Sequence, residues 1–323
     1  MTGGGAPDGI LLVDKNAGFT SHDVVAKTRR LIGTRKVGHA GTLDPMATGL
    51  LILGVGNSTR LLTYFVGLDK VYEATIRLGV ATTTDDAEGE PLSSAADGVI
   101  AKVTNEGIVA GVAALTGHIQ QVPSTVSAIK IGGKRAYARV RAGDDVVLAA
   151  RAVTVASFEV IEVRRLGADT DRAAIDVDVR VACSSGTYVR ALARDLGAAL
   201  GVGGHLTSLR RTRIGPFRVE DACIVDNVGG ASALIDPAAA ASRLFRRLDL
   251  TEQQAVDLGH GKRIRCEEPP LSGSSAHFSY SARRDVARPV GEYLAAIDPG
   301  GRLVGLVAWR GTEATVVVNF PHD

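Results

Sequence analysis

The chain has 323 residues, of which 45% are hydrophobic and 22% charged, an ordinary composition for a folded globular protein. Its length allows two domains, or one large domain with an appendage. No apolar run reaches the roughly 18 residues that a membrane span needs. The opening MTGGGAPDG lacks the basic and apolar layout of a signal peptide. We therefore expect a cytoplasmic protein with no membrane partner and with a flexible tail over residues 1–8.

The net charge of +2 is too small to indicate a partner, but its distribution is uneven. Residues 123–151 hold six Lys or Arg against two acidic residues, and residues 203–218 hold four Arg and no acid. Two such segments are compatible with contacts to a polyanion. A run of charge is, however, more often a solvated face of the protein.

The cysteines and acidic residues give no metal signature. Cys183, Cys223 and Cys266 lie far apart and form no CxxC pair, so neither a zinc site nor a disulfide framework is expected. The acidic stretch TTTDDAEGEP, residues 82–91, departs from the calcium-loop template at its third and fifth positions. A turn is the preferred interpretation, and metal binding is the alternative.

The first half of the chain alternates buried strands with short helices. Thr20 and Asp23 stand at capping-box spacing before an apolar period that ends at Gly33, which predicts an amphipathic helix. The segment KVYEATIRLGV alternates strictly, with Tyr72 on its apolar face. In chain order we expect a strand at 10–13, a helix at 19–33, a strand at 50–55, a helix at 58–66 and a strand at 70–80.

The second half mixes strands and helices without a regular repeat, which favours an α+β fold over a doubly wound sheet. A helix is expected at 104–117, and the basic, weakly periodic residues 123–151 are interpreted as an insertion. A strand with inward Ile175, Val177, Val179 and Val181 precedes a turn and a helix. An Ala/Gly-rich connector with a small helix follows at 227–242. Beyond it, short strands and Gly-rich turns predict a small β-barrel-like unit, in which 267–289 forms a mobile loop.

Asp44 stands out in VGHAGTLDPMATGLLILGVG, residues 37–56, between a Gly/Thr-rich turn and an apolar run. An Asp-Pro pair can simply start a helical turn, with Asp as the N-cap. The buried strand that follows would, however, fix the turn rigidly, as a catalytic group requires. No second carboxylate for paired acid–base chemistry is evident nearby, so one carboxylate would act as nucleophile or base.

Further candidates carry structural alternatives of their own. Tyr72 is either a core tyrosine or a platform for a planar base. In CSSGTYVRALARDLG, Tyr188 and Arg190 are two residues apart, so they face one site only if the turn is not helical. Arg190 is either a surface cation or, if buried, needs a carboxylate partner, for which Asp44 is a candidate. HLTSLRRTRIG is either a basic edge strand or a set of phosphate contacts beside a packed site.

GHAGTLDPMATGLL closely resembles the catalytic motif of the TruB family of pseudouridine synthases, which isomerise uridine 55 in the T-loop of transfer RNA. LLVDKNAGFTSHD, DKVYEA, CSSGTYVRALARDLG and HLTSLRR resemble further segments of that family, over about residues 9–225. One departure is visible, because Asn16 stands where the family commonly has Pro. The segment that begins VPSTVSAIK resembles the family's T-loop-gripping insertion, and the C-terminal unit resembles an RNA-binding PUA-type domain.

The resemblance implies catalytic roles. Asp44 would be the nucleophile or base that acts on a flipped uridine, on either the base or the sugar. Tyr72 would stack on the base. Tyr188 would lie under the base and assist proton removal at C5, and Arg190 would pair with Asp44. His39 would fill the space of the flipped nucleotide or stabilise its own loop.

The remaining matches imply support and substrate binding. Lys15 would support the site from the first strand, and Leu209 would pack against the target base. Basic residues would contact the RNA backbone, from the insertion and from the late strand: Lys130, Arg135, Arg210 and Arg211. Isomerising uridine involves no redox change and no net group transfer, so neither a cofactor nor a metal is expected.

The implied fold is a pseudouridine synthase catalytic domain over 9–226, built on a mixed, mainly antiparallel sheet and carrying the insertion at 123–151. A connector over 227–245 and a PUA-like domain over 246–323 would follow. We expect a monomeric isomerase that acts on the T-arm of tRNA without an obligate protein partner. The alternative is a non-catalytic RNA-binding or tRNA-folding protein, which would have no need to assemble Asp44, Tyr72, Tyr188 and Arg190.

Overall fold

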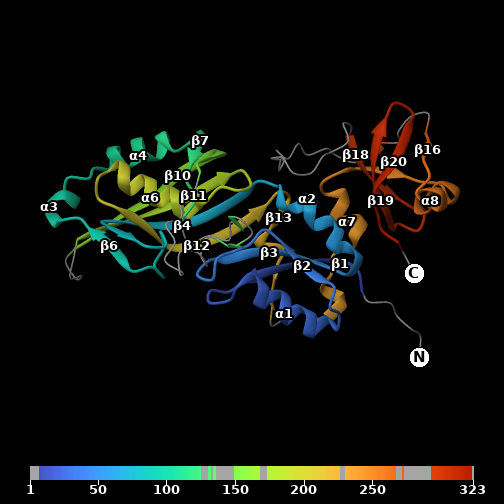
Figure 1. Cartoon of the computed structure of the whole chain (residues 1–323), viewed down its shortest axis with the longest axis horizontal. Coiled ribbons are helices and arrows are strands. Elements are labelled where there is room, and N and C mark those ends of the chain that lie inside the picture. Colours follow the sequence, from blue (N-terminus) through green and yellow to red (C-terminus); the bar gives the residue numbers. More distant parts are fainter. Residues whose placement is uncertain are drawn as a thin grey trace. The chain divides into compact units, whose positions relative to one another are not determined.

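A computed structural model describes most of the chain and divides it into two compact units (Figure 1). The described residues are 7–124, 130–131, 134–135, 149–167, 173–225, 230–266, 271–272 and 292–321. The first unit comprises Met1–Leu68 with Arg213–Asp323, and the second comprises Asp69–Thr212. The predicted sequential boundaries at 226 and 245 stay a prediction. Within the described residues, no helix has the length and apolar character that crossing a membrane requires.

The first unit is built around two strands that are buried on both faces. β1 (Gly9–Lys15) pairs antiparallel with β3 (Thr48–Val55), from Gly9 opposite Val55 to Lys15 opposite Gly49. Their even and odd side chains enter two different apolar clusters, Ile10 and Leu12 in one and Leu11 and Val13 in the other. Burial on both faces is the reason that these strands read as continuous apolar runs. Both predicted strands are confirmed.

Short elements complete this sheet. β2 (Val37–Ala40) pairs antiparallel with β3, and β14 (Cys223–Ile224) pairs parallel with β1. The last residues of β12 (Gly204–Ile214) pair antiparallel with β13 (Phe217–Arg218), which precedes the 3-10 turn η2 (Val219–Asp221). The sheet is therefore mixed and mainly antiparallel, as predicted.

Helix α1 (Ser21–Ile32) begins and ends where the sequence predicts. Thr20 is its N-cap and forms the complete capping box with Asp23, which also lowers the Asp23 pKa through the hydrogen bonds from Thr20. Gly33 ends the helix at φ 75°, in the left-handed region. The predicted helix at 58–66 is confirmed as the 3-10 helix η1 (Gly56–Leu61) followed by α2 (Leu62–Val66).

The C-terminal part of the first unit forms a second, curled sheet, which confirms the predicted small β-barrel-like domain (Figure 1). Its strand order is β16-β20-β19-β18-β15-β17, and α8 (Glu252–Gly259) packs against β19 and β20. The preceding connector contains η4 (Gly230–Ala233) and α7 (Pro237–Ser242). The strands are β15 (Arg246–Asp249), β16 (Ile264–Arg265), β17 (Leu271–Ser272), β18 (Glu292–Ile297), β19 (Leu303–Arg310) and β20 (Glu313–Asn319). Most of the loop predicted at 267–289 lies outside the described residues.

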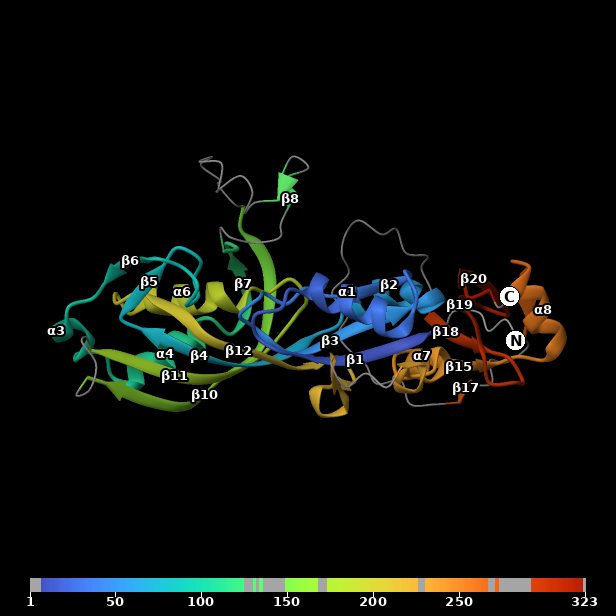
Figure 2. The same ribbon diagram turned by 90° about the horizontal axis from the view of Figure 1, so that it is seen from below.

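The second unit is a sheet of order β12-β4-β11-β10-β7, and its long strands β10 and β11 run side by side (Figure 2). The strands besides β12 are β4 (Lys70–Leu78), β7 (Gly117–Gln121), β10 (Arg151–Leu166) and β11 (Ala174–Cys183). Two short hairpins accompany it, β5 (Val80–Thr82) with β6 (Pro91–Ser94) and β8 (Lys130–Ile131) with β9 (Lys134–Arg135).

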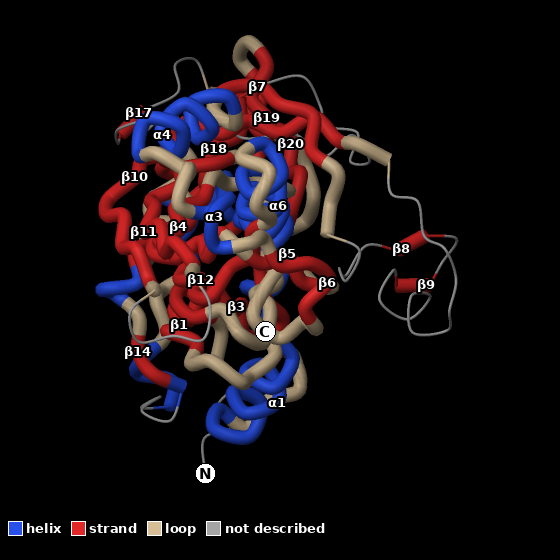
Figure 3. Tube along the Cα trace, turned by 90° about the vertical axis from the view of Figure 1, so that its left-hand side faces the viewer, coloured by secondary structure: helices blue, strands red, loops and turns tan. Residues whose placement is uncertain are grey.

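The helices of the second unit pack against this sheet (Figure 3). Among the described residues of this unit they are α3 (Asp97–Ile100), α4 (Asn105–Ala114) and α6 (Val189–Ala199), with α4 against β10 and α6 against β4. The predicted alternation of β4 and β11 is confirmed, since Ile76, Leu78, Val177 and Val181 are fully buried.

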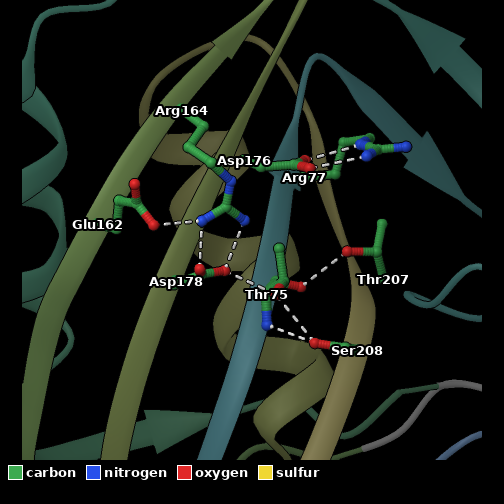
Figure 4. A network of polar contacts seen from close by, with 8 residues as sticks. All are labelled: Thr75, Arg77, Glu162, Arg164, Asp176, Asp178, Thr207 and Ser208. Carbon is green, nitrogen blue, oxygen red and sulfur yellow. Dashed lines mark hydrogen bonds and ion pairs between the residues drawn. The ribbon is translucent and has the colours of Figure 1, made fainter.

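Polar side chains link four neighbouring strands of this sheet (Figure 4). Asp178 accepts hydrogen bonds from Arg164, with Nη2 to Oδ1 at 2.9 Å, and from Thr75 at 2.7 Å. Ser208 donates to Thr75 at 2.9 Å, and Arg77 makes two bonds to Asp176. The Arg164 guanidinium holds the pKa of Asp178 below its usual value. Cross-strand charge pairs thus support the register of β10, β11 and β4, and hydroxyl hydrogen bonds link β12 to β4.

Gly197 offers a test of how α6 is seated. A Cβ at this position would lie 2.2 Å from the backbone C of Gly203 and the backbone N of Gly204. The Gly197→Ala substitution should therefore lower the free energy of unfolding by about 2 kcal/mol, the usual cost of overpacking. Thermal or urea denaturation measures it. Gly98→Ala, in α3 with nothing within 4 Å, is the control and should be neutral or stabilising; equal stability of the two variants would contradict the packing described here.

Candidate active site

Asp44 lies in the loop that joins β2 to β3, between two buried anchors. Leu43 is 3% exposed and Ala47 is fully buried, whereas Asp44 itself is only partly buried. The Asp44 carbonyl accepts a hydrogen bond from the Ala47 N–H at 3.1 Å, which makes a tight turn. The loop backbone is therefore fixed on both sides of Asp44, a residue that is itself only partly buried.

Lys15 ties this loop to the first strand. Its ammonium is fully buried and donates to the carbonyls of Phe19 at 2.7 Å, Asn16 at 3.0 Å and Pro45 at 3.2 Å. Pro45 directly follows Asp44, and its carbonyl also accepts the Gly18 N–H at 2.9 Å. A buried charge is costly unless it is hydrogen-bonded, so the Lys15 contacts constrain where the Asp44 loop can lie.

Asn16 takes part through its carbonyl, not through its side chain, which is exposed. Proline also carries a carbonyl in this position. The replacement of the family's common Pro by Asn16 therefore leaves the Lys15 contact in place.

Ser21 holds the same loop from the start of α1, and sequence reasoning missed it. Its hydroxyl donates to the Leu43 carbonyl at 3.2 Å and accepts the Leu43 N–H at 2.9 Å. His39, on β2 opposite Leu53, stacks edge-on against His22 with ring centroids 5.4 Å apart. Ser21 directly follows the N-cap Thr20 and shares no pattern with the distant Leu43, so the sequence carried no signal for its role.

The second unit holds the aromatic candidates. Tyr72 lies on β4 opposite Val181 and is 8% exposed, on the face that also carries Ala74 and Ile76. Leu209, on β12, is 7% exposed. Both residues are largely enclosed, and their predicted contacts with a base stay a prediction.

Tyr188 is the N-cap of α6, with φ −102° and ψ 105°. This extended conformation is the non-helical geometry that the spacing of Tyr188 and Arg190 requires. The side chain of Gln121 bonds both backbone groups of Tyr188: it accepts from the N–H at 2.8 Å and donates to the carbonyl at 3.0 Å.

Arg190 is buried and has a carboxylate partner that the sequence analysis did not find. Its Nη1 donates to Asp86 Oδ2 at 3.0 Å and to the Thr84 carbonyl at 2.9 Å. The two side chains are 6% and 3% exposed. Arg190 is thus not a surface cation. Its predicted pairing with Asp44 stays a prediction.

Asp86 belongs to the acidic stretch 82–91, whose interpretation as a turn is confirmed. Its carboxylate also accepts the Thr84 hydroxyl and the Glu88 N–H, the latter at 3.1 Å. The neighbouring Asp85 pairs with Arg194 at 3.3 Å, and burial raises the pKa of Asp85 against the opposing effect of a Ser124 hydrogen bond. Among the described residues, no cluster of His, Cys, Asp and Glu is suited to a metal.

The basic candidates divide into two kinds. Arg210 is partly exposed, but Arg211 is 1% exposed and is one of the largest fully buried side chains. Burial raises the pKa of the nearby Cys183 to about 12, and the positive charges of Lys70 and Arg211 oppose this shift. The interpretation of this segment as a basic edge strand is therefore wrong at Arg211, whose side chain is enclosed, and its interpretation as a set of phosphate contacts stays a prediction.

Lys130 and Arg135 stand opposite one another in the β8–β9 ladder. Most of the predicted insertion around them lies outside the described residues. The basic residues Lys134, Arg139 and Arg141 were counted in the same segment, and the last two also fall outside the description.

Comparison with known proteins shows the family to which this chain belongs. A model of the TruB family pseudouridylate synthase N-terminal domain matches residues 29–189, and one of the tRNA pseudouridylate synthase B C-terminal domain matches residues 190–253. The tRNA pseudouridine synthase B of Leifsonia xyli subsp. xyli (strain CTCB07) is 59% identical over 315 residues, 98% of this chain and 97% of the relative. This chain belongs to the TruB family. A second relative, the tRNA pseudouridine synthase B of Arthrobacter sp. (strain FB24), is 53% identical over 97% of this chain and 96% of the relative.

Solved structures share the fold. A chain of an H/ACA RNP bound to a substrate RNA containing 2'-deoxyuridine aligns with a TM-score of 0.66 at 23% identity, over 97% of this chain and 85% of its own. A chain of a Cbf5-Nop10-Gar1 complex gives 0.65 at 25% identity, over 97% and 84%. The predicted pseudouridine synthase fold is confirmed. As a TruB family member, the protein is an isomerase that converts uridine in tRNA to pseudouridine.

The pair formed by Arg190 and Asp86 yields a test. Asp86→Asn keeps the shape but leaves a buried guanidinium without its opposite charge, which should cost about 3 kcal/mol of unfolding free energy. The rate at which uridine in tRNA is converted should fall together with the stability, since Arg190 loses its fixed position. Denaturation and tritium release from C5-labelled uridine measure the two effects. Glu90→Gln, an exposed neighbour in the same turn, is the control; a normal Asp86→Asn protein would refute the importance of the pair.

Proposed function

We propose that the protein isomerises uridine 55 in the T-loop of tRNA, with Asp44 acting on a uridine that has been flipped out of the loop. The observation that carries this proposal is the Asp44 loop, in which the partly buried Asp44 is held between the buried Leu43 and Ala47 and the next residue, Pro45, is bonded by Lys15. The relatives named tRNA pseudouridine synthase B support the substrate class. A fixed carboxylate suits a nucleophile or base, because misplacement by 1 Å can cost about a hundredfold in rate.

The reaction needs little beyond positioned protein groups. The N1–C1' glycosidic bond breaks, the uracil rotates, and a C5–C1' bond forms while the C5 proton is lost and N1 gains one. Atoms and electrons balance without an oxidant or a second substrate. Asp44 assists by attack on the base or the sugar, or as a base at the sugar. All of these routes require an ionised carboxylate at the start of the reaction.

The base must leave its stack, which costs a few kcal/mol. Stacking on Tyr72 offsets part of this cost, since a base–aromatic contact contributes about 1–3 kcal/mol. Tyr188 contacts the base from the other side and assists removal of the C5 proton. His39 and Leu209 complete the surroundings of the flipped nucleotide. An unpaired T-loop is a suitable target because its bases are already partly unstacked.

Backbone contacts supply affinity. Arg210, which is partly exposed, and the insertion with Lys130 and Arg135 contact RNA phosphates. Arg211 is assigned a structural role in view of its burial. The protein acts as a monomer in the cytoplasm, where its tRNA substrate is found. Family membership favours this enzyme over the non-catalytic RNA-binding alternative.

The central prediction concerns Asp44→Asn and a T-arm stem-loop that carries C5-tritiated uridine. The variant should release tritium at least about a thousandfold more slowly than the native protein, because a nucleophile acts in the transition state. Its affinity for the stem-loop should stay within about tenfold. Asp221→Asn, an exposed aspartate of the same unit, is the matched control.

Three outcomes of that experiment count against the proposal. Release by Asp44→Asn at the native rate would remove Asp44 from the chemistry. If tritium were released from intact tRNA but not from any uridine of the T-arm, the target would lie elsewhere in the tRNA. Binding of the stem-loop without release by any of the three proteins would favour the RNA-binding alternative.

A further prediction concerns Arg210. Arg210→Gln should weaken tRNA binding and reduce the slope of log affinity against log salt by about 1, the effect of losing one phosphate contact. Arg180→Gln is the control, because its exposed side chain lies opposite Glu73 on a charge-paired part of the sheet. Filter binding over a salt series measures both. An unchanged slope for Arg210→Gln would exclude it from the phosphate contacts.

A further inference from the structure

Gln121 is a buried amide at a junction of the second unit. It is the last residue of β7 and pairs with Arg151, the first residue of β10, so the insertion leaves and re-enters the sheet at this point. Its side chain is enclosed, at 1% exposure for the whole residue, while the adjacent Gln120 is exposed. The two consecutive glutamines therefore lie in opposite environments, and only Gln121 can bond a partner in the protein interior.

That partner is the backbone of Tyr188. The Tyr188 N–H donates to Gln121 Oε1 at 2.8 Å, and Gln121 Nε2 donates to the Tyr188 carbonyl at 3.0 Å. The Gln121 carboxamide thus bonds both the N–H and the carbonyl of one residue, as the backbone of a neighbouring strand would. The same carbonyl also accepts the Leu192 N–H at 3.3 Å, the first hydrogen bond of α6. Gln121 thus fixes the residue at which the chain changes from extended to helical.

The start of the same turn is held separately. The Ser184 N–H donates to the Thr154 carbonyl at 2.8 Å, and the Ser184 hydroxyl accepts the Thr154 N–H at 3.0 Å. Between these two anchored points, Gly186 has φ 92°, and a Cβ there would meet nothing within 4 Å. Tyr188 has no helix-capping hydrogen bond from its own side chain. The backbone from which the Tyr188 ring projects is thus restrained by Gln121.

We infer that Gln121 is a positioning residue for catalysis, which sets the orientation of the Tyr188 ring by clamping the Tyr188 backbone. The inference rests on the proposed role of Tyr188 at the target base. Gln121 acts on the chemistry and not on RNA affinity, since its side chain is enclosed and faces the backbone of Tyr188. Arg194 adds to the rigidity of this region by donating to the Val122 carbonyl at 2.8 Å.

The test uses Gln121→Met, which keeps the length of the side chain and removes both hydrogen bonds. The single-turnover rate of tritium release from C5-labelled tRNA, with enzyme in excess, should fall at least about tenfold, as expected for a displaced catalytic group. The affinity for tRNA should stay within about threefold. Gln120→Met is the matched control and should behave as the native protein.

A double-mutant cycle separates positioning from general destabilisation. If Gln121 acts through the Tyr188 ring, Gln121→Met should cost clearly less in a Tyr188→Phe background, where the hydroxyl to be positioned is already absent. Equal fold losses in the two backgrounds would overturn the inference, as would a native rate for Gln121→Met. If Gln121→Met does not fold, Gln121→Glu replaces it, since it keeps the acceptor for the Tyr188 N–H but loses the donor to the carbonyl.

The Asp44→Asn protein is measured alongside, so that the two ideas fail separately. A native rate for Gln121→Met with inactive Asp44→Asn would overturn the positioning role alone. Active Asp44→Asn would overturn the proposed function, whatever the result at Gln121.

Discussion

The buried ammonium of Lys15 is the constraint on which the Asp44 loop depends. An isolated charge inside a protein is strongly unfavourable, so Lys15 can be fully enclosed only where acceptors surround it. Three backbone carbonyls do so, from two different segments of the chain, and one of them belongs to Pro45. Because the Lys15 charge can be buried only together with these acceptors, it restrains the position of Pro45, the residue that follows the candidate nucleophile.

The second unit also buries a charged side chain, and here a side chain of opposite charge compensates for it. Arg190 and Asp86 are both almost fully enclosed, and each would be costly without the other. The acidic turn 82–91, which has no sign of metal binding, provides the carboxylate and holds it with the Thr84 hydroxyl and the Glu88 N–H. The acidic stretch, which the sequence predicts to be a turn, therefore supplies a buried carboxylate partner for Arg190 of α6.

Backbone-directed side chains recur around the candidate catalytic residues. Lys15 acts on Pro45, Ser21 on Leu43, and Gln121 on Tyr188. None of these contacts involves the side chain that would meet the base. Each instead bonds the main chain of the candidate residue or of its direct neighbour. Such an arrangement suits an enzyme that needs rigid placement of a few groups around a base that enters from RNA.

Local signals in the sequence determined the elements of this protein. Thr20, Asp23 and Gly33 defined α1, and alternation defined β4 and β11, because capping and periodicity depend only on neighbours along the chain. The long motif around Asp44 was also sufficient to indicate the family. Partners distant in sequence were decided by the tertiary structure alone. Asp86 for Arg190, Gln121 for Tyr188 and the burial of Arg211 follow from strand order and helix packing, which bring together residues whose types gave no sign of one another.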